Sequence, residues 1–193
     1  MTVARQTLKT PRLRLRPLAA THAEAIHEAV LASRAELLPW MPWARDPTIS
    51  GGRSQAVRSR RGWEEDREFR FTVMGLTTRE VLGVVGLGRL DGKDESAAEL
   101  SYWIRSDRTR QGLATEACRA LIAWAPGALG VRRLTLWAGR GNVASRRVAA
   151  KLGFAHIGPL GWRPDGGLGT FEAEAYELEL ATPGRRDPMT AAS

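Results

Sequence analysis

The spacing of hydrophobic and polar residues predicts a strand and then a helix at the start of the chain. Residues 12–18 (RLRLRPL) alternate polar and apolar with a period of two, which is typical of a strand with one buried face. Thr21 has the character of a helix N-cap, with Glu24 three residues later, and apolar residues then recur at helical spacing. We therefore expect a helix over 21–37, ending before Pro39.

The next stretch changes from helical to strand character. Residues 46–53 (DPTISGGR) are typical of a loop, and 54–66 have the pattern of a charged helix. Three segments rich in β-branched and aromatic residues follow, with Gly75 and the run 91–96 (DGKDES) as the turns between them. We expect three antiparallel strands, at 69–74, 81–90 and 97–104.

The last third of the chain predicts an alternation of helices and strands. A helix over 113–125 has its small and apolar residues on one face, and Pro126 is expected to end it. The pattern then predicts a strand at 134–138, an amphipathic helix at 143–152, and strands at 154–158 and 171–180.

Length and composition favour one compact domain. We expect a domain over 11–181, preceded by a flexible segment, 1–10, and followed by a disordered tail, 182–193. No apolar run approaches the roughly 18 residues of a membrane-spanning helix, and the N-terminus has no signal-like apolar region, so a cytoplasmic protein without membrane contact is expected.

Cysteine and histidine usage argues against a metal site. Cys118 is the only cysteine, so no intrachain disulfide can form, and we interpret it as a small buried hydrophobe. The three histidines, His22, His27 and His156, are too scattered for a zinc signature. The sequence therefore predicts no metal.

The net charge of +8 is unevenly distributed. Six basic residues and no acidic ones fall between 130 and 152, whereas five acidic residues and no basic ones fall between 164 and 181. Such a bipolar chain suits an anionic cofactor and a cationic acceptor better than a uniform polyanion, although most single arginines cover solvated faces. Binding of nucleic acid is accordingly the less favoured interpretation.

The segment 99–125 carries the most specific signal for chemistry. A strand (ELSYWI) passes through a polar turn (RSDRTRQG) directly into a helix (LATEACRALIAWA). Such a turn exposes the backbone N–H groups of Gln111, Gly112, Leu113 and Ala114 at a helix N-terminus, which favours an anion such as phosphate. A single glycine before a helix is usually only a turn, so the argument depends on the small residue and the arginines around it.

Three motifs together resemble a known family. AELSYW, RTRQGLATEACRAL and GNVASRRVAAKLGF are similar to the core of the GNAT superfamily of N-acetyltransferases, in particular its RimJ/RimL-type ribosomal-protein members. The segment 38–44 (LPWMPWA) resembles a tryptophan-proline signature of that subgroup. The resemblance covers nearly all of 11–181. It implies an α/β (α+β) fold with a mixed, mostly antiparallel twisted sheet of six to seven strands, flanked by helices and splayed at the acetyl-CoA site.

The resemblance also implies where acetyl-CoA binds. One departure is Thr109, which stands where the family pattern has Gln or Arg; the backbone cradle does not depend on it. The 100–104 strand would pair with the pantetheine arm, the 108–115 turn would hold the pyrophosphate, and the start of the 143–152 helix would lie near the sulfur. The implied cofactor-binding residues are Leu100, Ser101, Tyr102, Trp103, Ile104, Arg108, Arg110, Gln111, Gly112, Leu113, Ala114, Thr115, Asn142, Ser145 and Arg147.

Two residues are the candidates for catalysis. The resemblance makes Glu99 the general base, acting through water, and Ser145 the proton donor for the departing thiolate. From the residues alone, Glu99 fits a solvent-exposed carboxylate equally well, because it alternates with Ala98, Leu100 and Tyr102 on the strand. Asn142 is also expected to N-cap its helix in either case.

The acceptor amine is less well defined. The resemblance points to Trp40, Trp43 and Glu172 as acceptor-binding residues, although tryptophans are more often core and Glu172 fits a solvated strand end equally well. Deprotonating an α-amine at pH 7 costs about 1 to 1.5 kcal/mol, against roughly 4 to 5 for lysine, which favours a protein N-terminus of the ribosomal-protein kind. The alternatives are a small cationic amine or antibiotic, and a non-catalytic acyl-CoA- or nucleic-acid-binding module. The sequence leaves a homodimer open.

Overall fold

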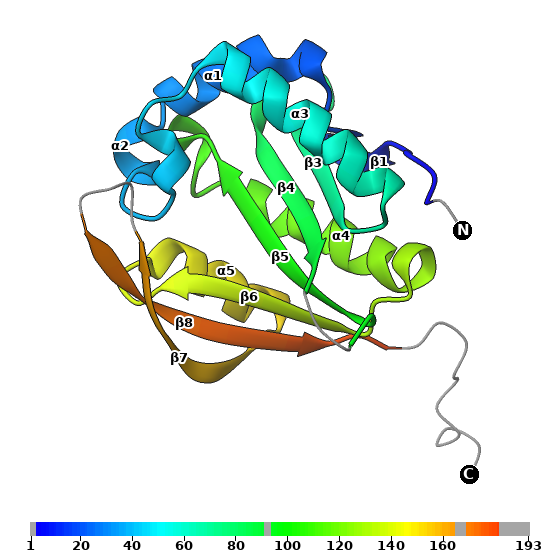
Figure 1. Ribbon diagram of the computed structural model, residues 1–193, viewed down its shortest axis with the longest axis vertical. Coiled ribbons are helices and arrows are strands. Elements are labelled where there is room, and N and C mark those ends of the chain that lie inside the picture. The colour runs from blue at the N-terminus through cyan, green and yellow to red at the C-terminus, as the bar shows by residue number, and fades with distance from the viewer. Residues whose placement is uncertain (1–2, 91–93, 165–168, 182–193) are drawn as a thin grey trace.

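The protein folds around one twisted sheet with helices on both faces (Figure 1). The computed structural model describes residues 3–90, 94–164 and 169–181. Within these residues, eight strands pair in the order β1-β2-β3-β4-β5-β6-β8-β7. They are β1 (Leu8–Lys9), β2 (Leu13–Pro17), β3 (Glu68–Gly75), β4 (Val81–Arg89), β5 (Ala97–Ile104), β6 (Arg133–Gly139), β7 (Ala155–Pro164) and β8 (Thr170–Glu179).

Five α-helices belong to the described part of the chain. They are α1 (Ala23–Leu31), α2 (Arg34–Leu37), α3 (Ile49–Glu64), α4 (Leu113–Leu129) and α5 (Val143–Leu152). Three short 3₁₀ turns, at Ala20–His22, Pro42–Ala44 and Ser106–Arg108, connect them to their neighbours. None of the described helices is long and apolar enough to span a lipid bilayer.

Neighbouring strands run antiparallel except at the centre of the sheet, where β5 and β6 are parallel. The expected fold class, a mixed and mostly antiparallel sheet with flanking helices, is confirmed. The sheet has one strand more than the sequence indicated, because Leu8 and Lys9 pair with Leu15 and Arg14 of β2. This strand lies inside the segment 1–10, which we expected to be flexible.

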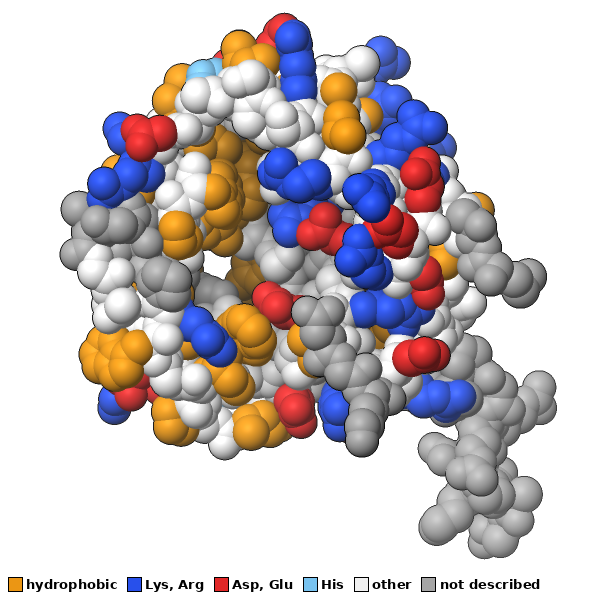
Figure 2. Space-filling view, in the orientation of Figure 1, with side chains coloured by type: hydrophobic (Ala, Val, Ile, Leu, Met, Phe, Trp, Pro, Cys, Tyr) orange, Lys and Arg blue, Asp and Glu red, His pale blue; other side chains and the backbone are white. Residues whose placement is uncertain are grey.

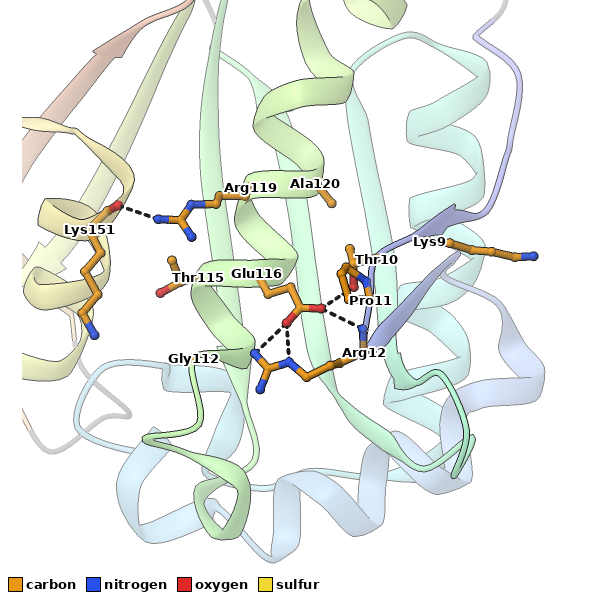
Figure 3. Close-up of a pocket in the computed structure, with 10 residues that line it drawn as sticks. All are labelled: Lys9, Thr10, Pro11, Arg12, Gly112, Thr115, Glu116, Arg119, Ala120 and Lys151. Atoms are coloured by element: carbon orange, nitrogen blue, oxygen red, sulfur yellow. Dashed lines mark hydrogen bonds and ion pairs between the residues drawn. The ribbon is translucent and has the colours of Figure 1, made fainter.

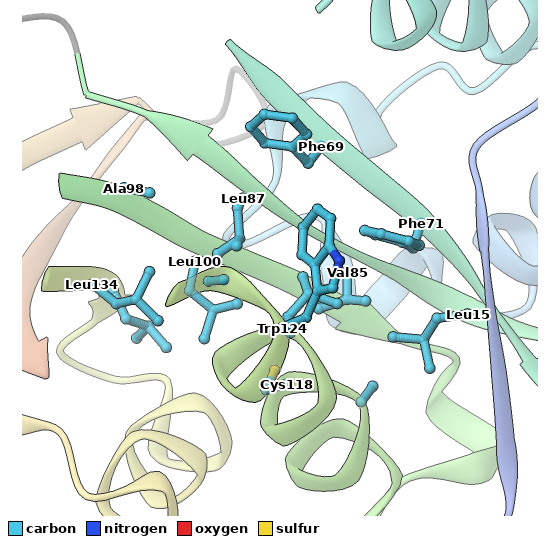
Figure 4. Packing of buried hydrophobic residues seen from close by; sticks show 14 of the residues in the cluster. Leu15, Phe69, Phe71, Val85, Leu87, Ala98, Leu100, Cys118, Trp124 and Leu134 are labelled. Carbon is cyan, nitrogen blue, oxygen red and sulfur yellow. The ribbon is translucent and has the colours of Figure 1, made fainter. Parts of the chain in front are cut away.

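The larger core lies between the sheet and α4. Cys118 and Leu121 of α4 are fully buried and belong to one cluster with Phe71, Val85 and Leu100 from the strands (Figure 4). Cys118 is fully buried, which confirms its interpretation as a small hydrophobe, and this burial raises the pKa of its thiol. We refer to this side of the sheet as the α4 face.

A smaller cluster covers the opposite side, which we refer to as the α1 face. Here Ala29 and Val30 of α1 pack with Val84 of β4 and Trp103 of β5. The two faces thus follow the period-two alternation of β5: Ala98 and Leu100 point to the α4 face, and Trp103 to the α1 face.

The first predicted helix, 21–37, is wrong in its start and its continuity. Thr21 lies within a 3₁₀ turn rather than at an N-cap, and α1 begins at Ala23. The helix breaks near Ser33, whose hydroxyl donates to the carbonyl of Ala29 at 2.8 Å and accepts the N–H of Ser106 at 2.9 Å. A hydroxyl that bonds the backbone in this way competes with a continuous helix.

Two further boundaries differ from the prediction. The expected loop 46–53 is helical from Ile49, because Thr48 caps α3 by accepting the N–H of Gly51 at 3.0 Å. Pro126 does not end α4, which continues to Leu129 and stops at Gly130, where φ is 66°. The proline removes only one backbone hydrogen bond near the helix end, and burial of Leu129 in the core offsets that loss.

The strand after α5 is longer than expected. β7 extends from Ala155 to Pro164, whereas the prediction was 154–158. The predicted tail, 182–193, lies outside the described residues, as do positions 91–93 of the predicted turn and Asp165 of the acidic segment.

Candidate active site

The sheet opens between β5 and β6, as Figure 1 shows. The two strands pair only from Ala97 with Arg133 to Glu99 with Thr135, and then diverge. Residues 100–104 of β5 keep their partners on β4, but none is paired with β6. The backbone on that side of β5 is therefore available to an extended ligand, because N–H and C=O groups inside a protein need partners.

Glu99 is the last residue of β5 that pairs with β6, so it lies at the point of divergence. Its side chain belongs to the α1 face and is half-buried. Burial raises the pKa of Glu99, while the charges of Arg70 and Arg163 act in the opposite direction. A carboxylate whose pKa is raised toward neutrality is a better proton acceptor than an ordinary surface glutamate.

Figure 2 shows a hollow in the α1 face where β5 and β6 separate. Trp40 reaches this region from the chain after α2 and packs edge-on against Phe171 of β8, with ring centroids 5.6 Å apart. Its ring also covers Gly139 at the end of β6, where a β-carbon would come within 2.3 Å of it. The ring centroids of Trp43 and Trp103 are 5.9 Å apart, and the Trp43 side chain remains half-exposed. Both tryptophans that we expected at the acceptor site thus stand on the α1 face.

Ser145 lies in the first turn of α5, on the α4 face of the sheet and near the place where β5 and β6 diverge. Asn142 caps this helix, as expected, by accepting the N–H of Ser145 on Oδ1 at 3.0 Å. The Ser145 hydroxyl is 3.0 Å from the hydroxyl of Tyr102, which points from β5 to the α4 face. Burial raises the pKa of Tyr102, so its hydroxyl stays protonated at neutral pH.

The turn before α4 has the shape expected of an anion cradle. Gly112, at the N-cap, has a φ of 76°, and Arg110 also has a positive φ of 62°. A glycine cap has no side chain to occupy the N–H groups of the first helical turn, and side-chain substitution at this φ is strained. Thr109 donates its hydroxyl to the carbonyl of Ser106 at 2.8 Å, so it supports the turn rather than extending from it.

A groove of about 640 Å³ runs from this turn along the outer surface of α4 (Figure 3). Arg119 spans from α4 to α5 and donates to the carbonyl of Lys151 at 3.2 Å. The local sequence around the turn does not indicate that Lys9 and Arg12 line this groove, because about a hundred positions of the chain separate them from the turn. The lining residues are Lys9, Thr10, Pro11, Arg12, Gly112, Thr115, Glu116, Arg119, Ala120 and Lys151.

The remaining predicted residues are less favourably placed. Arg108 forms ion pairs with Glu80 at 3.2 Å and with Asp107 at 3.5 Å, whereas Arg110 and Arg147 are exposed. These arrangements leave the cofactor roles of the three arginines as predictions.

Within the described part of the acidic segment 164–181, two of the four carboxylates are paired and two, Glu177 and Glu179, are not. Glu172 accepts from the Arg140 guanidinium at 2.8 Å, and Glu174 is buried and bonded to His156. Both alternate with Ala173 and share parity with Tyr176, which belongs to the α4-face core. They therefore lie on the face opposite Glu99, and the role of Glu172 toward an acceptor stays a prediction.

Comparison with known proteins adds a family to this geometry. A family model described as an acetyltransferase (GNAT) domain matches residues 12–155. YdaF of Bacillus subtilis, provisionally named a ribosomal N-acetyltransferase, is 27% identical over 146 residues, which are 75% of this chain and 78% of YdaF. YoaA of the same organism, an uncharacterized N-acetyltransferase, is 29% identical over 153 residues, covering 79% and 85% of the two chains.

Solved structures share the fold. RimL, a ribosomal L7/L12 α-N-protein acetyltransferase in complex with coenzyme A, superposes with a TM-score of 0.81 at 19% identity, over 91% of this chain and 98% of RimL. RimJ of Mycobacterium smegmatis gives 0.82 at 22% identity, over 91% and 88%. At these identities the likeness concerns the fold alone.

Proposed function

The chain belongs to the GNAT acetyltransferase family, and on that premise we propose that it moves an acetyl group from acetyl-CoA to a primary amine, with a protein N-terminal α-amine as the acceptor. In this reaction the amine nitrogen attacks the thioester carbonyl, the C–S bond breaks, the amine gives up a proton and the thiolate takes one. Each of these proton transfers needs a suitably placed group.

The observation that carries the proposal is the position of Glu99 at the point where β5 and β6 diverge. In our proposal the thioester lies in this gap, and Glu99 takes the amine proton through a water molecule from the α1 face. The raised pKa of Glu99 supports this role, because a stronger base transfers a proton more readily near neutral pH. Unpaired N–H groups of β5 near Tyr102 and Trp103 would polarise the carbonyl.

Ser145 is proposed as the donor that protonates the departing thiolate. Its hydroxyl lies 3.0 Å from that of Tyr102, and the two face the gap from the α4 face, opposite Glu99. With Glu99 and Ser145 on opposite sides of the thioester, one residue would accept the proton of the amine and the other would donate a proton to the thiolate. The turn at 111–114, with its glycine cap, is proposed to hold the phosphates of acetyl-CoA.

The α-amine is favoured as acceptor for two reasons. Because its pKa is lower, deprotonating an α-amine at pH 7 costs about 3 kcal/mol less free energy than deprotonating a lysine, which suits a base acting through water. Two of the four acidic side chains of β8, Glu172 and Glu174, are engaged by Arg140 and His156, which leaves fewer carboxylates to attract a small polycation. The names of YdaF and RimL are consistent with this choice.

The test is a screen of acetyl-CoA turnover over N-terminal peptides and small amines. We expect peptide N-termini to be acetylated best, and Glu99→Gln to lower kcat by roughly a hundredfold, with the loss shrinking at higher pH as the acceptor becomes neutral. The exposed carboxylate of Glu179 provides the control, and Glu179→Gln should change kcat by less than about twofold.

Other outcomes would identify other functions. Turnover confined to small cationic amines would replace the peptide acceptor by a small molecule. No turnover with any amine, together with tight acetyl-CoA binding, would indicate a non-catalytic acyl-CoA module.

A further inference from the structure

Glu116 in the first turns of α4 is bound from three directions by the segment that precedes β2. Its Oε1 accepts the hydroxyl of Thr10 at 2.5 Å and the backbone N–H of Arg12 at 3.0 Å, and its Oε2 accepts Nε of Arg12 at 2.7 Å. Figure 3 shows these residues converging on the carboxylate. The Glu116 side chain is only 16% exposed, whereas that of Arg12 is 51% exposed.

The same guanidinium also reaches the turn itself. Nη1 of Arg12 donates to the carbonyl of Gln111 at 2.9 Å, and Nη2 lies 3.6 Å from the place that a β-carbon on Gly112 would occupy. Arg12 thus joins the carboxylate of one helical turn to the carbonyl just before that helix. A planar guanidinium can serve two acceptors at once in fixed directions, which a lysine cannot do.

This arrangement removes an electrostatic conflict. A carboxylate in the first turns of α4 would repel an anion held by the N–H groups of the same helix start. Burial alone would raise the pKa of Glu116, but the hydrogen bonds from Thr10 and Arg12 outweigh it and lower that pKa. Glu116 is therefore ionised, and the adjacent Arg12 compensates its charge.

We propose that Arg12 is a positioning residue for acetyl-CoA, which fixes the carbonyl of Gln111 and so holds the N–H groups at 111–114 in the orientation that receives the phosphates. The inference rests on the proposed cofactor site at this turn. It adds to that site a residue from the segment before β2, about a hundred positions away in the chain. Thr10 contributes indirectly, because its hydroxyl also accepts the N–H of Leu13 at 2.9 Å and anchors the segment to β2.

The test compares acetyl-CoA affinity, measured by calorimetry, with the melting temperature of the free protein. Arg12→Met should weaken acetyl-CoA binding by about tenfold or more, the range expected for losing charged hydrogen bonds. Arg12→Lys keeps the charge but loses the fork to Gln111, and it should retain a loss of about fivefold. Trp63→Phe serves as the structural control. Trp63 of α3 is buried against Phe69 of β3, away from Arg12, so its truncation should lower the melting temperature without weakening acetyl-CoA binding more than about twofold.

The outcomes separate this inference from the proposed site. Unchanged affinity in Arg12→Met, or full affinity in Arg12→Lys, would overturn the positioning role. So would an equal loss of affinity in Trp63→Phe, since that would trace the effect to stability alone. Gly112→Asp reports on the site itself: if it weakens binding while Arg12→Met does not, only the role of Arg12 fails, and if neither weakens binding, the turn is not the phosphate site.

Discussion

The two helices that border the gap, α4 and α5, begin in opposite ways. At α4 the cap is Gly112, which offers no side chain to the N–H groups of the first turn. At α5 the cap is Asn142, whose side chain already accepts the N–H of Ser145. The first helix start is open to an anion through its backbone, whereas the second is closed and presents a hydroxyl instead.

The two helix starts also differ in the charged residues around them. The first turns of α4 contain Glu116, which is compensated by Arg12 from a distant part of the chain. The first turn of α5 contains no acidic residue, and its Ser145 is paired with the neutral hydroxyl of Tyr102. The two helix starts thus differ in backbone conformation, in the side chain at the cap and in nearby charge, which matches the separate roles of binding and proton transfer that we propose for them.

The largest effect is expected from closing the open helix start. Gly112→Asp places a carboxylate at the proposed phosphate site and should weaken acetyl-CoA binding by about a hundredfold or more. A hundredfold excess of acetyl-CoA over Kd should raise the melting temperature of the wild type by roughly 5 to 10 °C, and that shift should vanish in the variant. Gly127→Asp, on an exposed position of the same helix with open space around it, should keep the shift; losing it there too would contradict a local effect.

The next effect concerns the hydroxyl at the closed helix start. Ser145→Ala should lower kcat by roughly tenfold to a hundredfold, because the thiolate then leaves without a positioned donor. Raising the pH should not restore the rate, in contrast to Glu99→Gln, since in the proposed reaction Ser145 protonates the thiolate whereas Glu99 takes the proton of the amine. Ser54→Ala, on the exposed surface of α3, is the control, and wild-type turnover in Ser145→Ala would assign the proton to another group.

A smaller effect should follow from removing the cap of α5. Asn142→Ala is expected to lower the free energy of unfolding by about 1 kcal/mol, and the melting temperature by roughly 2 to 4 °C. Asn142→Asp can accept the same N–H and should retain most of that stability. A full loss in the aspartate variant, measured by thermal unfolding, would show that the capping bond is not what stabilises this end.

The smallest effect is expected at Tyr102. Tyr102→Phe should lower kcat by about fivefold, the size of one lost hydrogen bond, with little change in the melting temperature. Combined with Ser145→Ala it should add almost nothing, because both changes remove the same contact. Fully additive losses in that double-mutant cycle would mean that the two hydroxyls act independently.

The parts of this site that depend on local sequence were predictable. The strand, turn and helix around Gly112 follow from neighbouring residues, and so does the cap at Asn142. The alternation along β5 correctly placed Glu99 and Tyr102 on opposite faces, but it did not indicate that α1 buries Trp103. Periodicity assigns a residue to a face without saying what covers that face.

The parts that depend on distant contacts were not predictable from one sequence. Ser33 breaks the first helix through a bond to Ser106, seventy-three positions later. Arg12 meets Glu116 across 104 positions. Neither residue has a local pattern that reveals its partner, and both contacts result from the packing of the sheet.

The contact between Trp40 and Gly139 has a mechanical consequence. On the open side of the gap, backbone hydrogen bonds no longer join β5 to β6, so side-chain packing connects the two halves of the sheet there. Leu37 belongs to the cluster that contains Trp103 of β5 and Met41 packs against it, while the Trp40 ring between them in the sequence lies against Gly139 of β6. A packed aromatic ring resists compression but transmits little tension, because dispersion contacts weaken steeply with distance. The width of the gap is therefore held less firmly by such packing than by the hydrogen-bonded part of the two strands, which pairs from Ala97 to Glu99.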